Sequence, residues 1–95
     1  MLLRFTSFDD PSLVHAITTR TGGVSEPPYD ALNMSFSRPD NPHAVRENRC
    51  RVCSALEIAP GRVVQAGQIH GNAVQTVSQQ HAGCGALDHA TLLPP

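Results

Sequence analysis

The chain is organised around a long polar loop over residues 18–33, which reads Thr18-Thr-Arg-Thr-Gly-Gly-Val-Ser-Glu-Pro-Pro-Tyr-Asp-Ala-Leu-Asn33. Its length and polarity are typical of a binding loop. Gly22 and Gly23 allow a positive φ or a close approach of the backbone to a ligand, because neither has a Cβ atom. Arg20 precedes them with a planar set of donors that suits phosphate or carboxylate. The loop is therefore a candidate anion site, although a structural Gly-Gly turn beside a surface arginine explains the same residues.

Several stretches around this loop have the composition of β-strands. Residues 2–8 and 13–19 are predicted strands separated by an Asp-Asp-Pro turn, and residues 32–36 alternate apolar and polar side chains. Residues 63–71 and 73–77 predict two more strands around a Gly-Asn break. The fold class that follows is α/β (α+β), a mixed β-sheet with flanking helices.

The clearest predicted element is a helix that runs to Ile58, with Asn41 as its N-cap and Pro42 at its first helical position. The sequence Ala59-Pro60-Gly61 is expected to end it. Spacings of seven and four residues predict a buried stripe of Val45, Val52 and Leu56. We expect three charged side chains of this helix to face outward or sideways, namely those of Arg46, Arg49 and Glu57.

Composition excludes several classes of function. The chain has 95 residues, a net charge of −1, three phenylalanines, one tyrosine and no tryptophan, so neither a nucleic-acid partner nor a membrane partner is expected. No apolar run approaches the roughly 20 residues of a membrane-spanning helix. Three cysteines without a signal peptide favour a cytoplasmic protein. The ending Leu-Leu-Pro-Pro suggests one domain, residues 1–95, cut short of its natural end, with residues 78–95 as a linker.

Cysteines and histidines offer two metal-binding hypotheses. One hypothesis is a structural zinc site, because its ligand spacing resembles that of Cys50, Cys53, His81 and Cys84. The first pair, however, lies inside the predicted helix, where small core thiols are the simpler explanation. His70 follows Gln68 on the same face of a predicted strand and could bind a metal or transfer a proton. By spacing alone, a partly buried structural histidine is the simpler explanation.

Three separated motifs resemble the YfiH family, also called the laccase-domain, multicopper polyphenol oxidase or peptidoglycan editing factor family. The similarity spans residues 13–77 and rests on Thr19-Arg-Thr-Gly-Gly-Val-Ser25 with Pro28-Tyr29 and Leu32-Asn33, on Asn41-Pro42 with Val45 and Glu47-Asn-Arg49, and on Gln68-Ile-His-Gly71. The resemblance implies that the chain is the N-terminal portion of a larger YfiH-like domain.

That resemblance also implies an activity. Members are described as zinc-dependent purine nucleoside phosphorylases with accompanying adenosine deamination, a hydrolase activity, and some as copper-dependent polyphenol oxidases. Their metal is held by a His-Cys-His set whose first member corresponds to His70, while the motifs of the other two ligands are absent here. His81-Ala-Gly-Cys-Gly85 only begins like the second-histidine motif, because the Trp-Arg that follows is missing. The expected cofactor is zinc, with copper as the alternative.

The site residues expected on this basis are His70 as metal ligand and catalytic residue, and Arg20, Gly22, Gly23, Asn33 and Gln68 as contacts to a purine nucleoside and phosphate. Asn33 is equally explained as a turn-capping amide. Two other classes of function remain, a small structural zinc module and a metal-free interaction domain or inactive fragment. If part of the sheet lies outside these residues, an exposed apolar face is expected to cause self-association.

Overall fold

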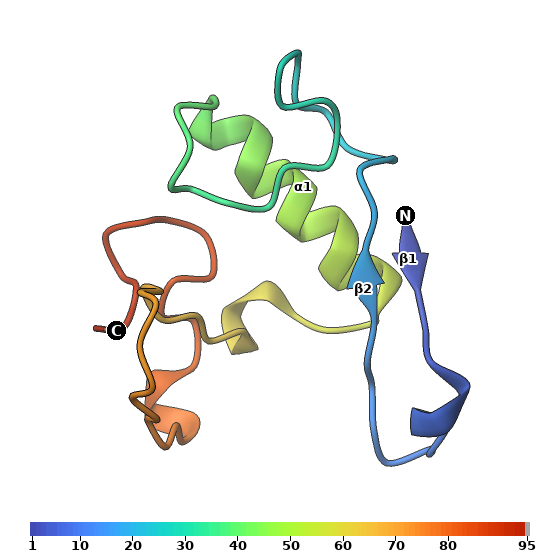
Figure 1. The fold of residues 1–95 in the computed structure, drawn as a ribbon, viewed down its shortest axis with the longest axis vertical. Coiled ribbons are helices and arrows are strands. Elements are labelled where there is room, and N and C mark those ends of the chain that lie inside the picture. Colours follow the sequence, from blue (N-terminus) through green and yellow to red (C-terminus); the bar gives the residue numbers. More distant parts are fainter. Residues whose placement is uncertain (95) are drawn as a thin grey trace.

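Helix α1 (Pro42–Ala55) is the longest element of the computed structural model, which describes residues 1–94. The other elements are β1 (Leu2–Leu3), β2 (Ile17–Thr18) and the 3-10 helices η1 (Thr6–Phe8), η2 (Pro60–Arg62) and η3 (Gln79–His81). Figure 1 shows β1 and β2 beside the C-terminal end of α1, with the chain after residue 60 gathered on the opposite side of the view. The α+β class is confirmed, but residues 1–94 contain a two-stranded sheet and not the predicted mixed sheet with flanking helices.

The start of α1 agrees with the sequence prediction. The Asn41 side-chain oxygen accepts a hydrogen bond of 2.9 Å from the backbone N–H of His43, and Pro42 occupies the first helical position. This pairing satisfies one of the unpaired donors at the helix start, while proline has no donor to satisfy. Local capping chemistry therefore fixes where the helix begins.

The end of α1 comes before the predicted Ile58. Glu57 takes a left-handed conformation with φ of 58°, and its backbone N–H donates to the carbonyl of Ser54. The N–H of Ile58 donates to the carbonyl of Cys53 at 2.8 Å. These two reversed hydrogen bonds form a Schellman closure, in which the left-handed position is usually glycine. The helix ends here and not at the Ala-Pro-Gly sequence.

The buried face of α1 consists of Val45, Asn48, Arg49 and Val52. Both valines belong to the predicted stripe, whereas Leu56 is only partly buried. The prediction that Arg49 faces outward or sideways is wrong, because its guanidinium finds protein partners in the interior. The apolar core also includes Leu32 and Ala86, which come from the segments on either side of the helix.

Strands β1 and β2 pair antiparallel, with Leu2 opposite Thr18 and Leu3 opposite Ile17. They are much shorter than the predicted strands 2–8 and 13–19. A 3-10 turn at Thr6–Phe8 interrupts the first one, and Asp10 accepts hydrogen bonds from both the N–H and the hydroxyl of Ser12. These local turns replace the ladder hydrogen bonds that longer strands would need.

The other predicted strands do not form. Residues 32–36 contain a turn in which the Asn33 side chain accepts a hydrogen bond from the N–H of Ser35 at 3.1 Å. Residues 63–77 form no strand ladder in the described chain: they make an isolated parallel bridge between Ala66 and Leu93, and a few further backbone hydrogen bonds connect Val63 and Gln65 to residues 60, 83 and 84. Residues 32–36 do alternate apolar and polar side chains, but none of these predicted strands has a neighbouring strand to pair with among residues 1–94.

Residues 78–94, expected to belong to a linker, pack against the rest of the chain. Ala86 is buried, and the N–H of Gln65 donates to the carbonyl of Cys84 at 2.8 Å. Pro95 lies outside the described residues, so the linker assignment stays a prediction. Within the described part of the chain, no helix has the length and apolar character needed to cross a membrane.

Candidate functional site

A cleft of about 550 Å³ lies between the polar loop of residues 18–33, helix α1 and the segment that follows η2. Its lining includes three of the predicted site residues, Arg20, Asn33 and Gln68, which are far apart in the sequence. A second hollow of about 620 Å³ shares Arg20 and Asn33 and adds Tyr29 and Arg38. The structure therefore brings a guanidinium and two amides to one cavity, although the roles of these residues stay predictions.

Arg20 has a carboxylate partner at the edge of this cleft. Its Nη2 lies 3.2 Å from Oδ2 of Asp30, and 77% and 45% of the two side chains are exposed. An exposed ion pair of this kind contributes at most about 1 kcal/mol. An incoming anion with better geometry could therefore replace Asp30. The carbonyl of Arg20 accepts hydrogen bonds from the N–H groups of Ala31 and Leu32, which fixes the backbone position of the arginine.

The glycine pair does not line the cleft; it lets the loop lie against α1. Gly22 has φ of 98°, in the left-handed region, and its carbonyl accepts a hydrogen bond of 3.1 Å from Arg51. A Cβ atom on Gly23 would collide with the carbonyl oxygen of Ala31 and would lie 2.6 Å from the Asn48 side-chain oxygen. The loop can approach the helix this closely because residue 23 has no side chain.

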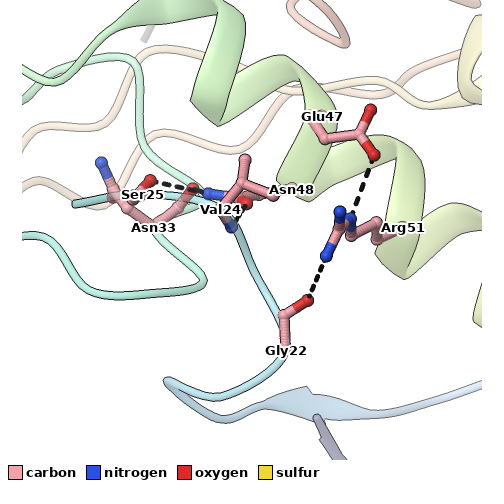
Figure 2. A network of polar contacts seen from close by, with 7 residues as sticks. All are labelled: Gly22, Val24, Ser25, Asn33, Glu47, Asn48 and Arg51. Atoms are coloured by element: carbon pink, nitrogen blue, oxygen red, sulfur yellow. Dashed lines mark hydrogen bonds and ion pairs between the residues drawn. The ribbon is translucent and has the colours of Figure 1, made fainter.

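Asn48 holds the loop in this position, as Figure 2 shows. Its side-chain oxygen accepts a hydrogen bond of 2.8 Å from the N–H of Val24. Its amide donates to Ser25 Oγ at 2.8 Å and to the carbonyl of Asn33 at 2.9 Å. All three bonds are made by a side chain that is fully buried. Figure 2 also shows Arg51 on α1 between Glu47 and the carbonyl of Gly22.

Asp40 extends this network toward the cleft. Its Oδ2 accepts hydrogen bonds from the Ser25 hydroxyl at 2.6 Å and from the Asn33 amide at 3.1 Å. The Ser25 hydroxyl is the main cause of a lowered pKa for the Asp40 carboxyl, with smaller contributions from the Asn33 amide and the Asn41 N–H. The Asn33 amide thus bonds to Asp40, its side-chain oxygen caps the local turn at Ser35, and the residue also borders the cleft.

Arg49 forms the floor of the cleft. Its guanidinium donates to the carbonyls of Met34 at 2.8 Å, Gly85 at 2.7 Å and Ala86 at 3.0 Å, and it lies 4.5 Å from the ring centre of Phe36. Burial lowers the pKa of Arg49, and the nearby sulfur of Cys53 opposes this shift. The arginine connects three segments of the chain through one side chain.

Sequence reasoning missed four polar residues of this site, namely Ser25, Asp40, Asn48 and Arg49. A signal for the two on α1 was available, because positions 48 and 49 fall between Val45 and Val52 on one helical face. Ser25 belongs to the Thr19–Ser25 motif of the family resemblance, but no hydrophobic periodicity marks Ser25 or Asp40 as a member of this network. Their partners come from segments that only the folded chain brings together.

His70 is exposed and lies outside the cleft wall, two positions after Gln68. The described residues contain no group of three or more His, Cys, Asp or Glu side chains placed to hold a metal. His70 thus fits the role of one metal ligand by its chemistry, but residues 1–94 do not form a complete site by themselves.

The alternative zinc module is not assembled either. His81 Nδ1 accepts a hydrogen bond from the N–H of Ser78 at 3.0 Å, as part of the cap of η3. Burial raises the pKa of the Cys53 thiol, Cys50 adds to this effect, and Arg49 opposes it. The thiolate of Cys53 is therefore less favoured than that of an ordinary cysteine, and Cys53 lacks the lowered pKa that marks a reactive nucleophile.

Comparison with known proteins confirms the resemblance seen in the sequence. The family described as multi-copper polyphenol oxidoreductase laccase matches residues 14–92. Purine nucleoside phosphorylase Rv2149c of Mycobacterium tuberculosis is 45% identical over 62 residues, which are 65% of this chain and 25% of that protein. The purine nucleoside phosphorylase of Deinococcus radiodurans is 46% identical over 69 residues, 73% of this chain and 26% of that protein.

Solved structures give the same assignment. The crystal structure of YlmD from Geobacillus stearothermophilus superposes with a TM-score of 0.82 and 36% identity, over 84% of this chain and 30% of that one. The hypothetical protein YfiH of Bacillus licheniformis gives a TM-score of 0.81 and 32% identity, over 83% of this chain and 30% of that one. The chain spans about a quarter of the length of the curated relatives named above. It belongs to the multi-copper polyphenol oxidoreductase laccase family and is YfiH-like.

Proposed function

We propose that this chain provides the anion-binding and nucleoside-binding wall of a purine nucleoside phosphorylase. The observation that carries the proposal is the convergence of Arg20, Asn33 and Gln68 on one cleft, in a chain whose relatives bear that name. Because the chain spans only a quarter to a third of those relatives, the complete active site includes further residues.

In the proposed reaction, a phosphate oxygen attacks the anomeric carbon of the ribose. The bond from that carbon to the purine nitrogen breaks, and the base leaves with the electron pair and takes up a proton. Arg20 binds the phosphate in place of Asp30, because its planar donors match two phosphate oxygens. Gln68 contacts the nucleoside through its amide. Asn33 and the loop backbone at Gly22 and Gly23 position this wall, and phosphate held at Arg20 is oriented for attack.

The zinc implied by the resemblance forms part of the proposal, with His70 as one ligand and copper as the alternative metal. When bound with an open position, such a metal supplies a Lewis acid and an activated water. Among residues 1–94 only His70 is assigned to it, so no reaction step is derived through the metal. Adenosine deamination, the second implied activity, depends on activated water and requires the missing ligands.

A chimeric enzyme tests the proposal. Residues 14–92 of this chain replace the matching segment of YlmD, and release of hypoxanthine from inosine is measured with and without phosphate. We expect phosphate-dependent turnover. We expect Arg20→Gln to raise the KM for phosphate at least about tenfold, because it removes an interaction worth roughly 1.4 kcal/mol or more.

Arg62→Gln is the matched control, because Arg62 is exposed and does not line either cavity that contains Arg20. Its KM for phosphate should equal that of the unmodified chimera. Turnover that does not require phosphate, or an Arg20 variant with an unchanged KM for phosphate, would contradict the proposed role of this chain.

A further inference from the structure

The second hollow, which borders the cleft, contains donor groups that no acceptor of the protein uses. Its volume is about 620 Å³. Its charged and hydrogen-bonding side chains are those of Arg20, Tyr29, Asp30, Asn33 and Arg38. Among residues 1–94, Arg38 forms no ion pair, and neither its guanidinium nor the Tyr29 hydroxyl makes a side-chain hydrogen bond. These two donors are therefore available to a ligand.

The carboxylate of Asp40, two residues after Arg38, is already engaged elsewhere. Its Oδ2 accepts hydrogen bonds from the Ser25 hydroxyl and the Asn33 amide, and its Oδ1 accepts one of 2.7 Å from the N–H of Asn41. Both carboxylate oxygens thus have partners, while Arg38 is exposed. The charge of Arg38 is not neutralised by this neighbour.

The charges and donors of the second hollow suit an anion with several oxygens. Its lining contains two guanidinium groups and a single carboxylate, that of Asp30, so positive charge is in excess. Arg20 follows β2, Tyr29 lies in the polar loop and Arg38 precedes α1, so the donors come from three segments. A phosphate group offers at least three strong acceptor oxygens, whereas a carboxylate offers two. Donors from three segments therefore favour phosphate.

Prolines restrict the backbone on which two of these donors stand. Pro28 precedes Tyr29, and Pro39 follows Arg38. Proline fixes its own φ and holds the residue before it in an extended conformation. A ligand that binds Arg38 and Tyr29 therefore has less backbone entropy to remove.

The size of the second hollow leaves room for more than the phosphate group. Its volume lies within the range of sites for small organic molecules. It also shares Arg20, Leu32 and Asn33 with the cleft, so one ligand can extend from one cavity into the other. A nucleotide with its nucleoside part in the cleft and its phosphate in the second hollow fits this arrangement.

We propose that the second hollow binds a phosphate group between Arg38 and Arg20, with the Tyr29 hydroxyl as a further donor. The group is free phosphate or the phosphate ester of a nucleotide. This inference rests on the proposed function only through Arg20, because Arg38 and Tyr29 have no part in that proposal. The two proposals can therefore fail separately.

A titration of the 95-residue chain with inorganic phosphate, followed by the NMR signals of its backbone amides, tests the proposal. Potassium chloride keeps the ionic strength constant, so that general screening does not change. We expect saturable shifts at residues 29 and 38. Arg38→Gln should weaken binding by about fivefold, the effect of an exposed ion pair of roughly 1 kcal/mol. Arg62→Gln removes an exposed arginine outside this hollow and should leave the dissociation constant unchanged.

Two further variants change the affinity in opposite directions. Tyr29→Phe removes only the hydroxyl and should weaken phosphate binding by about threefold. Asp30→Asn removes the carboxylate that competes for Arg20, so it should strengthen phosphate binding by about threefold. Unchanged amide signals of α1 show that each variant is folded. Weaker binding by the Asp30 variant would contradict the proposal.

Inosine 5′-monophosphate and inosine identify the source of the phosphate group. Tighter binding of the monophosphate than of inorganic phosphate, lost in Arg38→Gln, supports a nucleotide ester. Equal dissociation constants for the two phosphates, both dependent on Arg38, support free phosphate. Binding of inosine itself should not depend on Arg38.

Other results would overturn the inference. Equal losses in Arg38→Gln and Arg62→Gln would show a non-specific attraction of anions. Phosphate binding that depends on Arg20 and not on Arg38 would remove the second hollow as the site and leave the proposed function intact. Absence of saturable phosphate binding by the chain would also overturn the inference, while phosphate-dependent turnover of the chimera would still support the proposed function.

Discussion

The amide of Asn48 donates a 2.8 Å hydrogen bond to Ser25 Oγ and thereby joins helix α1 to the loop that carries the glycine pair. The Ser25 hydroxyl in turn donates a 2.6 Å hydrogen bond to the carboxylate of Asp40. The wall of the cleft thus depends on a buried polar network as well as on apolar packing. Such a network is costly to disturb, because each lost partner leaves a buried group unpaired.

Replacing Asn48 with Ala tests this network. Three hydrogen bonds disappear, which leaves the Ser25 hydroxyl unpaired in the interior and two part-buried backbone groups without their partner, so we expect the free energy of unfolding to fall by about 2–4 kcal/mol. Urea unfolding followed by circular dichroism measures the change. Glu47→Ala, one position earlier on an exposed side chain, should change the free energy by less than about 1 kcal/mol. Similar losses in both variants would show that the Asn48 network contributes little.

Gly23→Ala tests the close contact between loop and helix. The added Cβ would meet the carbonyl of Ala31 and would lie 2.6 Å from Leu32 Cα, so the backbone must shift. We expect a loss of about 2–3 kcal/mol in the free energy of unfolding. Gly61→Ala is the control, because a Cβ there meets no atom within 4 Å. That variant should be neutral or stabilised by at most about 1 kcal/mol. An unaffected Gly23 variant would contradict the observed packing.

Asp40→Asn tests the charge in the network through its pH dependence. The folded state lowers the pKa of Asp40, mainly through the Ser25 hydroxyl, so the carboxylate stabilises the fold above the unfolded pKa of about 3.9. This contribution is lost as the pH falls through the folded pKa. The variant should therefore be less stable than the natural chain at pH 7, and the difference should shrink as the pH is lowered below 4.

Asp9→Asn provides the comparison for this pH series. The Asp9 carboxylate has no hydrogen-bond partner in the part of the chain that the structure describes. Asp9→Asn should therefore change the free energy of unfolding by the same amount whether residue 25 is Ser or Ala. Adding Ser25→Ala to Asp40→Asn should cost less than Ser25→Ala alone, because the partner is already changed. A stability difference for Asp40→Asn that stays constant from pH 7 to low pH would refute the charge effect.

Local sequence signals predicted the features that local chemistry determines. The start of α1 depends only on the neighbouring residues Asn41 and Pro42, and the structure shows the expected cap. The strands failed for the opposite reason, because a strand needs a partner. Residues 73–77 have the strand pattern, yet nothing in the described chain pairs with them.

The candidate site likewise contains residues that the sequence predicted and residues that it did not. Arg20, Asn33 and Gln68 were selected from the sequence, and the fold brings them to one cleft. The prediction that Arg49 faces outward or sideways failed, although its spacing from Val45 and Val52 puts it on the buried face. Its three carbonyl partners come from residues 34, 85 and 86, and no local pattern reveals such distant acceptors.

Glu57→Gly tests the closure of α1. Glu57 has φ of 58°, where a side chain costs about 1–2 kcal/mol, and glycine adopts this conformation without that cost. Glycine also gains freedom in the unfolded chain, so the expected net increase in the free energy of unfolding is about 0.5–1 kcal/mol. Ser54→Gly places the same residue inside the helix and should instead decrease stability by about 0.5 kcal/mol. Thermal unfolding of the two variants side by side gives the signs directly, and a destabilised Glu57 variant would mean that the Glu57 side chain contributes more than its backbone strain costs.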